Sequence, residues 1–308
     1  MNKKILLIGS KGFLGRRVKD LAIIDNYEII EITGKNHVDI TDLKLFQKFL
    51  KDKEVDCIIN CAAFVGGISF GYKYQADLLK INSLMAANIY ELANQYNIPQ
   101  VINPISNCAY PGHLRLYKED DFWNGAPHSS VFNYALSKRL YVALGQSFFE
   151  QYGVSSNNVI LSNMYGPGDH FEEERSHALG ALVKKIVNAK LKNLDTVTIW
   201  GSGKPIREWL YVDDGAKSLI NSISLKPGNF LYNIGINKGS TITDIARLIS
   251  REVSWEGKLI FDTSKPDGVM EKKVDGSYGK SLLNWEPEVK LESGIKKTVD
   301  WYMNNYGE

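Results

Sequence analysis

The chain has 308 residues, of which 44% are hydrophobic and 23% are charged, and its formal net charge is +2. It is long enough for one large domain or two modest ones, and without a basic block it gives no indication of a nucleic-acid partner. No apolar run approaches the roughly 20 residues of a membrane-spanning helix, so we expect no membrane partner. Three cysteines, Cys57, Cys61 and Cys108, argue against a disulfide framework and predict a cytoplasmic protein, and their spacing predicts no metal site.

The first predicted strand, residues 5–8, runs directly into a glycine-rich turn with the spacing GxxGxxG, which precedes a helix expected over residues 13–23. Glycines between a buried strand and a helix allow a tight turn, and they let a pyrophosphate approach the helix N-terminus, where free N–H groups favour anions. This pattern predicts a dinucleotide site made by Gly9, Lys11, Gly12, Phe13, Leu14 and Gly15.

The second predicted strand, residues 27–32, indicates which dinucleotide is bound. An NAD-preferring site would place an acidic residue just after this strand to hold the ribose 2′-hydroxyl group, and Glu31 lies too early for that role. Lys35, together with Lys11 and Arg16, offers cations for a 2′-phosphate instead. We therefore expect NADP(H) as the cofactor.

Residues 39–42 are predicted to form a third strand that leads into a helix over residues 43–51. Asp39 could contact the adenine amino group or act as a cap, and Thr41 or Asp42 could cap the helix. A fourth strand over residues 55–60 is followed by the small residues Ala62 and Ala63, which allow the backbone to pass close to a cofactor. A long helix is expected over residues 74–95.

The fifth predicted strand, residues 101–105, delivers Ser106 to its carboxyl end, where ligands collect in doubly wound sheets. Tyr134 and Lys138 follow, four residues apart in a helix predicted over residues 130–151, and therefore on one face of it. We expect the ammonium group of Lys138 to lower the pKa of the Tyr134 phenol from about 10, so that the pair acts as an acid or base near neutral pH. Such a pair suits oxidoreduction at a carbonyl carbon, with Ser106 holding the carbonyl oxygen.

A sixth strand over residues 158–162 completes an alternation of strands and helices that predicts an α/β fold, a Rossmann-type doubly wound parallel sheet. From residue 164 onward the chain predicts a smaller mixed lobe. Its helices are expected over residues 176–190, 242–253 and 291–302, and its β segments over residues 197–203, 207–212 and 258–261. We expect residues 1–163 to bind the cofactor and residues 164–308 to form a substrate lobe that partly returns to the sheet.

Several longer motifs strengthen this interpretation: VGGI at 65–68, SNCAYP at 106–111, NMYGPGDHF at 163–171, SH at 176–177, WGSGKPIRE at 200–208 and SKPDG at 264–268. Together with the glycine turn and the Tyr134–Lys138 pair, they resemble the extended short-chain dehydrogenase/reductase family over nearly the whole chain. Within that family, the resemblance is closest to the group that epimerises carbons 3 and 5 of GDP-4-keto-6-deoxy-mannose and reduces its carbon 4.

The resemblance implies roles for individual residues. Tyr134 would donate a proton during reduction by NADPH, Lys138 would support it and bind the cofactor, and Ser106 would bond the ketone oxygen. Cys108 and His177 match the family's acid and base for epimerisation, and both residue types titrate near neutrality. The positions that match the family's GDP-sugar site are Val65, Asn163, Lys185, Trp200, Arg207, Lys265 and Asp267. The resemblance also implies a homodimer formed through the helices over residues 74–95 and 130–151.

Departures from the family pattern keep alternatives open. Asn60, Asn107, Glu271 and residues 116–123 and 128–131 differ from what the family commonly has there. One alternative is a carbon-4 reductase for a related GDP-4-keto sugar, such as a heptose, with epimerisation by another enzyme. A second is an NAD-dependent sugar-nucleotide epimerase or dehydratase, and a third is a non-catalytic NADP-binding redox sensor, which the retention of both Tyr134 and Lys138 argues against.

Overall fold

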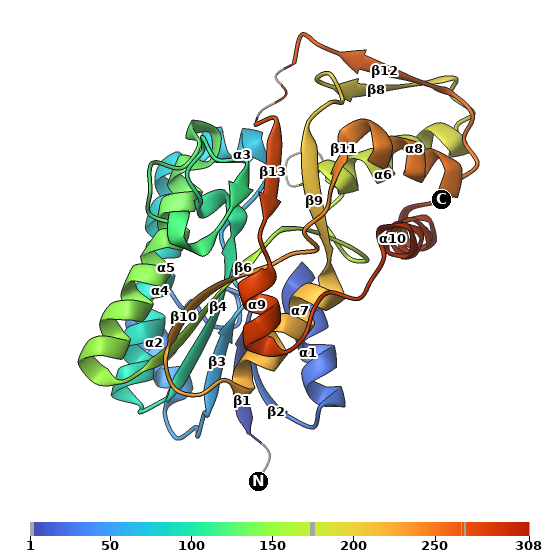
Figure 1. The fold of residues 1–308 in the computed structure, drawn as a ribbon. Coiled ribbons are helices and arrows are strands. Elements are labelled where there is room, and N and C mark those ends of the chain that lie inside the picture. The colour runs from blue at the N-terminus through green and yellow to red at the C-terminus, as the bar shows by residue number, and fades with distance from the viewer. Residues whose placement is uncertain (1–2, 173–175, 266, 268, 308) are drawn as a thin grey trace.

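A computed structural model of the protein describes residues 3–172, 176–265, 267 and 269–307, with the side chain of Ile68 outside this description. Within these residues, the chain forms a six-stranded parallel sheet between helices and a second lobe of shorter strands and helices beside one end of the sheet (Figure 1). The predicted α/β class and the doubly wound parallel sheet are confirmed.

The central sheet owes its buried position to short apolar strands. Its spatial order is β10 (Asn229–Ile234), β6 (Ser155–Leu161), β4 (Gln100–Ser106), β3 (Cys57–Asn60), β1 (Lys4–Ile8) and β2 (Glu28–Ile32). Successive side chains of a strand point to opposite faces, so Ile5 and Leu7 pack in one core while Leu6 and Ile8 pack in another. Because both faces are covered, β1 is apolar from Ile5 to Ile8 rather than alternating.

Helices from distant parts of the chain cover the two faces of the sheet (Figure 1). The core with Ile5 and Leu7 includes side chains of α1 (Phe13–Ile24) and α7 (Val212–Asn221). The opposite core includes side chains of α2 (Leu43–Leu50), α4 (Gln75–Gln95) and α5 (Phe132–Tyr152). The strand order reverses between β1 and β3, and the carboxyl ends of strands at such a switch point are where doubly wound folds bind ligands.

The second lobe is built around β9 (Ile206–Tyr211), which pairs with strands from several parts of the chain. Its neighbours are β7 (Asn163–Tyr165), β11 (Gly239–Thr241) and β13 (Glu271–Val274), and β13 also pairs with β5 (Leu116–Tyr117). A separate parallel pair is formed by β8 (Thr196–Trp200) and β12 (Lys258–Asp262). A third core lies among α6 (Ala178–Leu191), α8 (Ile242–Glu252) and α10 (Leu291–Tyr306).

Short helices connect these parts. They are α3 (Ile68–Lys73) and α9 (Ser277–Leu283), together with the 3₁₀ turns η1 (Asn107–Ala109), η2 (Glu119–Asp121), η3 (Ser129–Val131) and η4 (Ser222–Ser224). In the part of the chain that the structure describes, no helix is long and apolar enough to cross a membrane.

The predicted third strand over residues 39–42 is wrong, because the polar side chains there bond to their own backbone. Asp39 accepts hydrogen bonds from the backbone N–H and the hydroxyl group of Thr41, which makes a tight turn instead of a ladder. Asp42 caps α2 by accepting from the N–H groups of Lys44 and Leu45. The predicted fifth strand is therefore β4, and the predicted sixth strand is β6, which begins at Ser155.

Candidate active site

Ser106 and Cys108 lie together at the carboxyl end of β4, in the middle of the sheet. The Ser106 hydroxyl oxygen accepts a hydrogen bond of 3.2 Å from the backbone N–H of Cys108, which fixes the start of η1. Both residues are only half-buried. A nucleophilic or hydrogen-bonding group at this place is therefore held by the backbone and still reachable by a ligand.

Tyr134 and Lys138 lie on α5, as predicted, and Lys138 is held against β4. Its ammonium group donates a 2.9 Å hydrogen bond to the Pro104 carbonyl oxygen and is only 4% exposed. The ammonium nitrogen lies 5.8 Å from the centre of the Tyr134 ring and 5.1 Å from that of Tyr141. The expected tyrosine–lysine pair is thus formed beside the strand that carries Ser106.

The predicted lowering of the Tyr134 pKa is wrong for this structure. Burial raises the pKa of Tyr134, and the nearby thiol of Cys108 raises it further. Burial also lowers the pKa of Lys138 to about 8. Removing water disfavours the charged form of both groups, and burial is the largest cause of both shifts in pKa.

Cys108 links the reductase pair to the second lobe. Its thiol raises the pKa of Tyr134. The pKa of Arg207, a residue of β9, is lowered overall by burial, and Cys108 partly opposes this lowering. An electrostatic effect on both groups requires the thiol to lie near both of them. The structure therefore brings Cys108, Tyr134 and Arg207, which are distant in sequence, to one region.

His177 lies at the entrance to α6 and is held by a buried carboxylate. Its Nδ1 atom is 3.4 Å from Oδ1 of Asp169; the His177 side chain is 50% exposed and that of Asp169 only 1%. The bond to Asp169 raises the pKa of His177. Within the described residues, no hydrogen bond or ion pair joins His177 to Cys108 or Tyr134, so its place opposite Cys108 stays a prediction.

The glycine turn has the close backbone contacts of a dinucleotide site. Gly9 adopts φ = 80°, and a Cβ atom on it would lie 2.8 Å from the backbone nitrogen of Ala62. A Cβ atom on Gly15 would collide with the carbonyl oxygen of Gly9. Gly12 begins α1 without a side-chain cap, which leaves the first-turn N–H groups for an anion. Phe13 and Leu14 open the helix, and these residues fit a pyrophosphate.

A hollow of about 430 Å³ lies next to this turn, and its walls include the cations Lys11, Arg16 and Lys19 and the acids Asp20 and Glu31. Asp20 is paired with Arg17 at 2.8 Å. Glu31 is engaged by Lys19 at 2.7 Å, and this bond is the main cause of its lowered pKa. An acidic residue paired in this way is less available to a ribose hydroxyl group. Lys11 and Arg16 leave the hollow with cationic walls suited to a phosphate.

Lys35 and Asp39 are paired with each other at 3.2 Å, and Lys35 is largely exposed. Neither lines the hollow beside the glycine turn. Ala62 and Ala63 follow β3, and the Asn60 side chain accepts a hydrogen bond from the Ala62 N–H while donating to the Tyr141 hydroxyl group. Asn60 therefore connects the cofactor side of β3 to the tyrosine that packs beside Lys138.

The predicted substrate residues fall into two groups in the second lobe. Asp267 accepts hydrogen bonds from the backbone N–H and the hydroxyl group of Ser202, and its charge acts on Arg207. Trp200 is 62% exposed, with the ammonium nitrogens of Lys185 and Lys265 at 5.6 and 5.7 Å from its ring centre. An exposed indole flanked by cations suits a base joined to phosphates.

The other predicted substrate positions have structural contacts as well. Asn163 donates to the backbone carbonyl oxygen of Glu208, and Val65 is half-buried in the segment after β3. Pro266 and Gly268, which belong to the motif around Asp267, lie outside the described residues. Within the described residues, no cluster of histidine, cysteine or acidic side chains could hold a metal ion.

Sequence reasoning assigned no role to several residues that shape the site. Arg139, buried beside Lys138, donates to the backbone carbonyl oxygens of Ala109 and Phe122 and so holds the turn that carries Cys108. Asp169 and Glu208 are buried acids next to predicted site residues. In the sequence, the role of Asp169 and Glu208 was indicated only by their position inside the long motifs. Their burial, on which this role depends, cannot be seen in a sequence.

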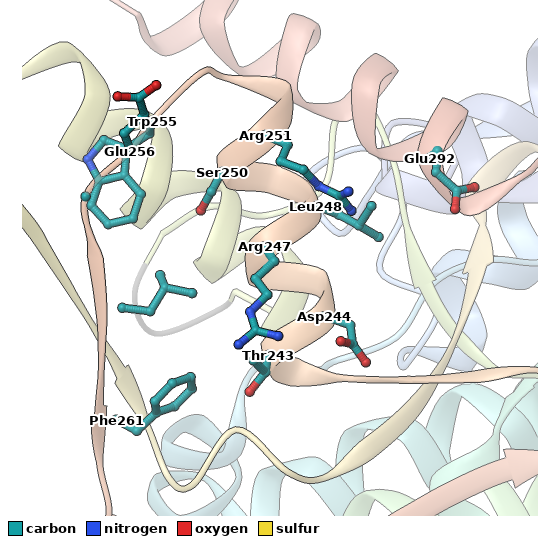
Figure 2. Close-up of a pocket in the computed structure, with 12 residues that line it drawn as sticks. Thr243, Asp244, Arg247, Leu248, Ser250, Arg251, Trp255, Glu256, Phe261 and Glu292 are labelled. Atoms are coloured by element: carbon teal, nitrogen blue, oxygen red, sulfur yellow. The ribbon is translucent and has the colours of Figure 1, made fainter.

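A larger hollow than the one beside the glycine turn lies elsewhere, between α8 and β12, with a volume of about 860 Å³ (Figure 2). Arg247 and Arg251 line it, together with the apolar side chains of Leu259 and Phe261. None of the residues predicted from the sequence belongs to its walls. We therefore assign the site from the chemistry of its residues and not from the size of a hollow.

A parallel sheet with a glycine turn after β1, at its switch point, and with Ser106 at the end of β4 beside Tyr134 and Lys138 of α5, defines a nicotinamide-dependent oxidoreductase of the short-chain dehydrogenase/reductase class. Comparisons with known proteins agree. The model of the NAD dependent epimerase/dehydratase family matches residues 5–235, and the chain belongs to this family. The expected resemblance to the extended short-chain dehydrogenases/reductases is confirmed.

Individual relatives within this family act on GDP-linked sugars, according to their names. GDP-L-fucose synthase of Escherichia coli (strain K12) is 30% identical to this chain, over 98% of the chain and 97% of the relative. GDP-L-colitose synthase of Yersinia pseudotuberculosis is 32% identical over 98% of both chains. The crystal structure of a GDP-L-fucose synthetase from Naegleria fowleri bound to NADP superposes with a TM-score of 0.89 at 26% identity, covering 100% of this chain and 96% of that one.

Proposed function

We propose that the protein is an NADPH-dependent enzyme that epimerises a GDP-4-keto-6-deoxy-hexose at carbons 3 and 5 and reduces it at carbon 4. The observation that carries this proposal is the grouping of Ser106, Cys108, Tyr134 and Lys138 at the carboxyl end of β4, within electrostatic reach of Arg207. The names of relatives at 30% and 32% identity, a GDP-L-fucose synthase and a GDP-L-colitose synthase, support the same substrate class.

Epimerisation needs acid and base groups on the two faces of the sugar ring. The carbon-4 ketone acidifies the protons on carbons 3 and 5, and the Ser106 hydroxyl group would stabilise the oxygen that becomes negative. Cys108 would remove a proton from one face and His177 would supply one to the other. The backbone of η1 holds Cys108 in place for this task.

Reduction follows at carbon 4, which lies between the two epimerised carbons. NADPH, when bound, supplies a hydride to carbon 4, while Tyr134 gives its proton to the ketone oxygen. The raised pKa of Tyr134 keeps the phenol protonated, as a donor must be before the step. Lys138, fixed by Pro104, stabilises the negative charge that develops on the phenol oxygen.

The cofactor choice is proposed from the cations beside the glycine turn. Lys11 and Arg16 line the hollow there, with Lys35 in the loop after β2, and Glu31 is already engaged by Lys19. These charges favour the 2′-phosphate of NADP over the free hydroxyl of NAD. Asp39 is proposed to lie near the adenine, and Ala62 and Ala63 against the cofactor backbone.

The sugar nucleotide is proposed to lie between the two lobes. Arg207 suits the diphosphate because its forked guanidinium can donate two parallel hydrogen bonds. Trp200, Lys185 and Lys265 would hold the nucleoside side, near Asp267, and Asn163 and Val65 would contact the sugar nucleotide. This assignment treats residues 1–163 as the cofactor part and residues 164–308 as the substrate lobe, with β10 returning to the sheet.

The Tyr134→Phe variant tests the reductase assignment. Loss of the phenol hydroxyl group should lower turnover of a GDP-4-keto-6-deoxy sugar by at least about a hundredfold, because general acid catalysis contributes that much. NADPH binding, followed by fluorescence titration, should stay within about twofold, since the hydroxyl group is one contact among many. Turnover close to that of the unaltered enzyme would show that Tyr134 is not the proton donor.

A carbon-4 reductase without epimerase activity is the second candidate. It is favoured by the departures from the family pattern near the site, such as Asn107 next to Cys108 and residues 128–131 before Tyr134. Deuterium uptake separates the two functions: in heavy water without NADPH, the epimerase incorporates deuterium at carbons 3 and 5, and the simple reductase incorporates none. Mass spectrometry of the recovered sugar gives the answer.

We also propose that the enzyme is a homodimer and works in the cytoplasm. Leu84 on α4 and Phe132 on α5 are large apolar side chains with more than a third of their surface exposed, and they lie on the two helices expected to form the interface. The free thiols of Cys57, Cys61 and Cys108 suit a reducing compartment.

A further inference from the structure

Asp169 occupies an unusual position for a carboxylate. Its side chain is 1% exposed, Oδ1 accepts a 2.7 Å hydrogen bond from the backbone N–H of His170, and Oδ2 is buried without a hydrogen-bond partner in the described residues. A Cβ atom added to Gly180, in the first turn of α6, would lie 3.6 Å from Oδ2. A buried carboxylate at a helix N-terminus is stabilised by the helix dipole, but it still needs a cation.

The loop that carries Asp169 is firmly held on two sides. Phe171 is buried against Trp301, Tyr302 and Tyr306 of α10, with ring centres 4.8 to 5.9 Å apart. At the other end of the loop, the guanidinium group of Arg16 packs against Gly168. Asp169 is therefore a fixed point, while the half-exposed His177 could otherwise take several orientations.

We propose that Asp169 is a positioning residue for His177, which holds the Nδ1 side of the imidazole and leaves Nε2 to exchange a proton with the sugar. The proposal rests on the proposed epimerase function. Asp169 is the described charged group that acts on His177, since neighbouring His170 lies 3.6 Å from Glu172 and Arg16 packs on Gly168. The bond to Asp169 is also the main cause of the raised pKa of His177.

The proton transfer that follows is simple. With Nδ1–H donating to the carboxylate of Asp169, Nε2–H of the imidazolium is the bond that breaks as a C–H bond forms on the deprotonated sugar carbon. The imidazole is then neutral, and its Nδ1–H group still donates a hydrogen bond to the carboxylate of Asp169. This bond keeps the ring in the tautomer whose Nε2 can accept the next proton. Without the carboxylate, the ring would lose both its orientation and part of its preference for the protonated form.

The pairing can be tested without turnover, by measuring the pKa of His177 with NMR in the full-length protein and identifying its signal with the His177→Gln variant. The pKa should lie above the ordinary value of about 6.5 in the unaltered protein and fall by about one unit in Asp169→Asn. The control is Glu172→Gln, the same kind of change in the same loop, which should leave the pKa of His177 unchanged. An equal pKa in Asp169→Asn and the unaltered protein would overturn the proposal.

If Asp169→Asn does not fold, the pKa of His177 in the unaltered protein is the test. A value at or below about 6.5 also overturns the pairing. Deuterium uptake at carbons 3 and 5 supplies the second readout. Uptake declines with rising pH, and this decline should begin about one pH unit lower in Asp169→Asn than in the unaltered enzyme. At pH 8, uptake by Asp169→Asn should be about tenfold lower. Absent uptake in the unaltered enzyme, combined with a normal shift in the His177 pKa, would refute the epimerase function while supporting the pairing.

Discussion

Lys138 is charged at a place that water hardly reaches. It is 4% exposed, bonds to the carbonyl oxygen of Pro104, and has its pKa lowered by burial to about 8. The unfolded chain holds the same proton up to a pH of about 10.4. Between these two pH values unfolding takes up a proton, so this residue makes the protein more stable as pH rises through that window.

The Lys138→Met variant should therefore be more stable than the unaltered protein at neutral pH. Removing the desolvated ammonium group should raise the unfolding free energy at pH 7 by about 2 kcal/mol, after allowing about 1 kcal/mol for the lost hydrogen bond to Pro104. The gain should shrink steadily above pH 8, as measured by urea denaturation at several pH values. Lys80→Met, which replaces an exposed lysine of α4, is the matched control and should show no such trend.

At the scale of residues, the sequence predicted where the site side chains lie better than it predicted their pKa shifts. The four-residue spacing correctly placed Tyr134 and Lys138 side by side on one helix, because helical geometry alone decides it. Their pKa shifts depend on how much water the packed structure leaves around them, and spacing carries no information about that. Asp169 was missed for the same reason, since its importance lies in its burial.

Glu208 joins β9 to β13 and to the loop that follows β10 of the central sheet. It is fully buried on β9, and its carboxylate accepts hydrogen bonds from the backbone N–H groups of Val274 on β13 and of Ile236 and Asn237 after β10. Burial raises the pKa of Glu208 to about 7. Because its neighbour Arg207 is the proposed diphosphate ligand, this carboxylate fixes the strand that presents the guanidinium group.

Glu208→Ala should remove the hydrogen-bond acceptor of three backbone N–H groups, of which that of Val274 is buried, and destabilise the protein by about 3 kcal/mol. Thermal and urea unfolding measure the loss, and affinity for GDP should fall as β9 loosens. Glu271→Ala on β13 is the control, because Glu271 forms a partly exposed ion pair with Lys273 and its removal should cost less than about 1 kcal/mol. Equal stability of the two variants would contradict this role for Glu208.

At the scale of elements, strongly patterned segments were predicted and short ones were not. The apolar run of β1 and the periodic helices α4, α5 and α8 were found because burial and period agree there. The predicted strand at residues 39–42 failed because Asp39 and Thr41 bond within their own turn. β10 and α7 were not predicted individually, since their place depends on partners far away in the sequence.

For the whole molecule, the exposed apolar side chains on α4 and α5 predict a dimer. Light scattering should give about twice the 34.7 kDa of one chain. Leu84→Glu should produce a folded monomer, because a charge buried in an apolar interface costs several kcal/mol. The control is Leu45→Glu on α2, a similarly exposed leucine outside the proposed interface, which should leave the dimer intact. A monomeric unaltered enzyme would contradict the prediction.

The edge position of β10 has a consequence for how the protein is made. β6 acquires its outer neighbour only when residues 229–234 are available. The part of the sheet face that α7 covers stays exposed to solvent until residues 212–221 have been synthesised. A growing chain on the ribosome therefore displays an unpaired strand edge and an exposed apolar surface while residues 162–234 are being synthesised. Truncated products that stop before residue 234 should be prime substrates for chaperones and proteases, and maturation of both lobes should be a late event after synthesis is nearly complete.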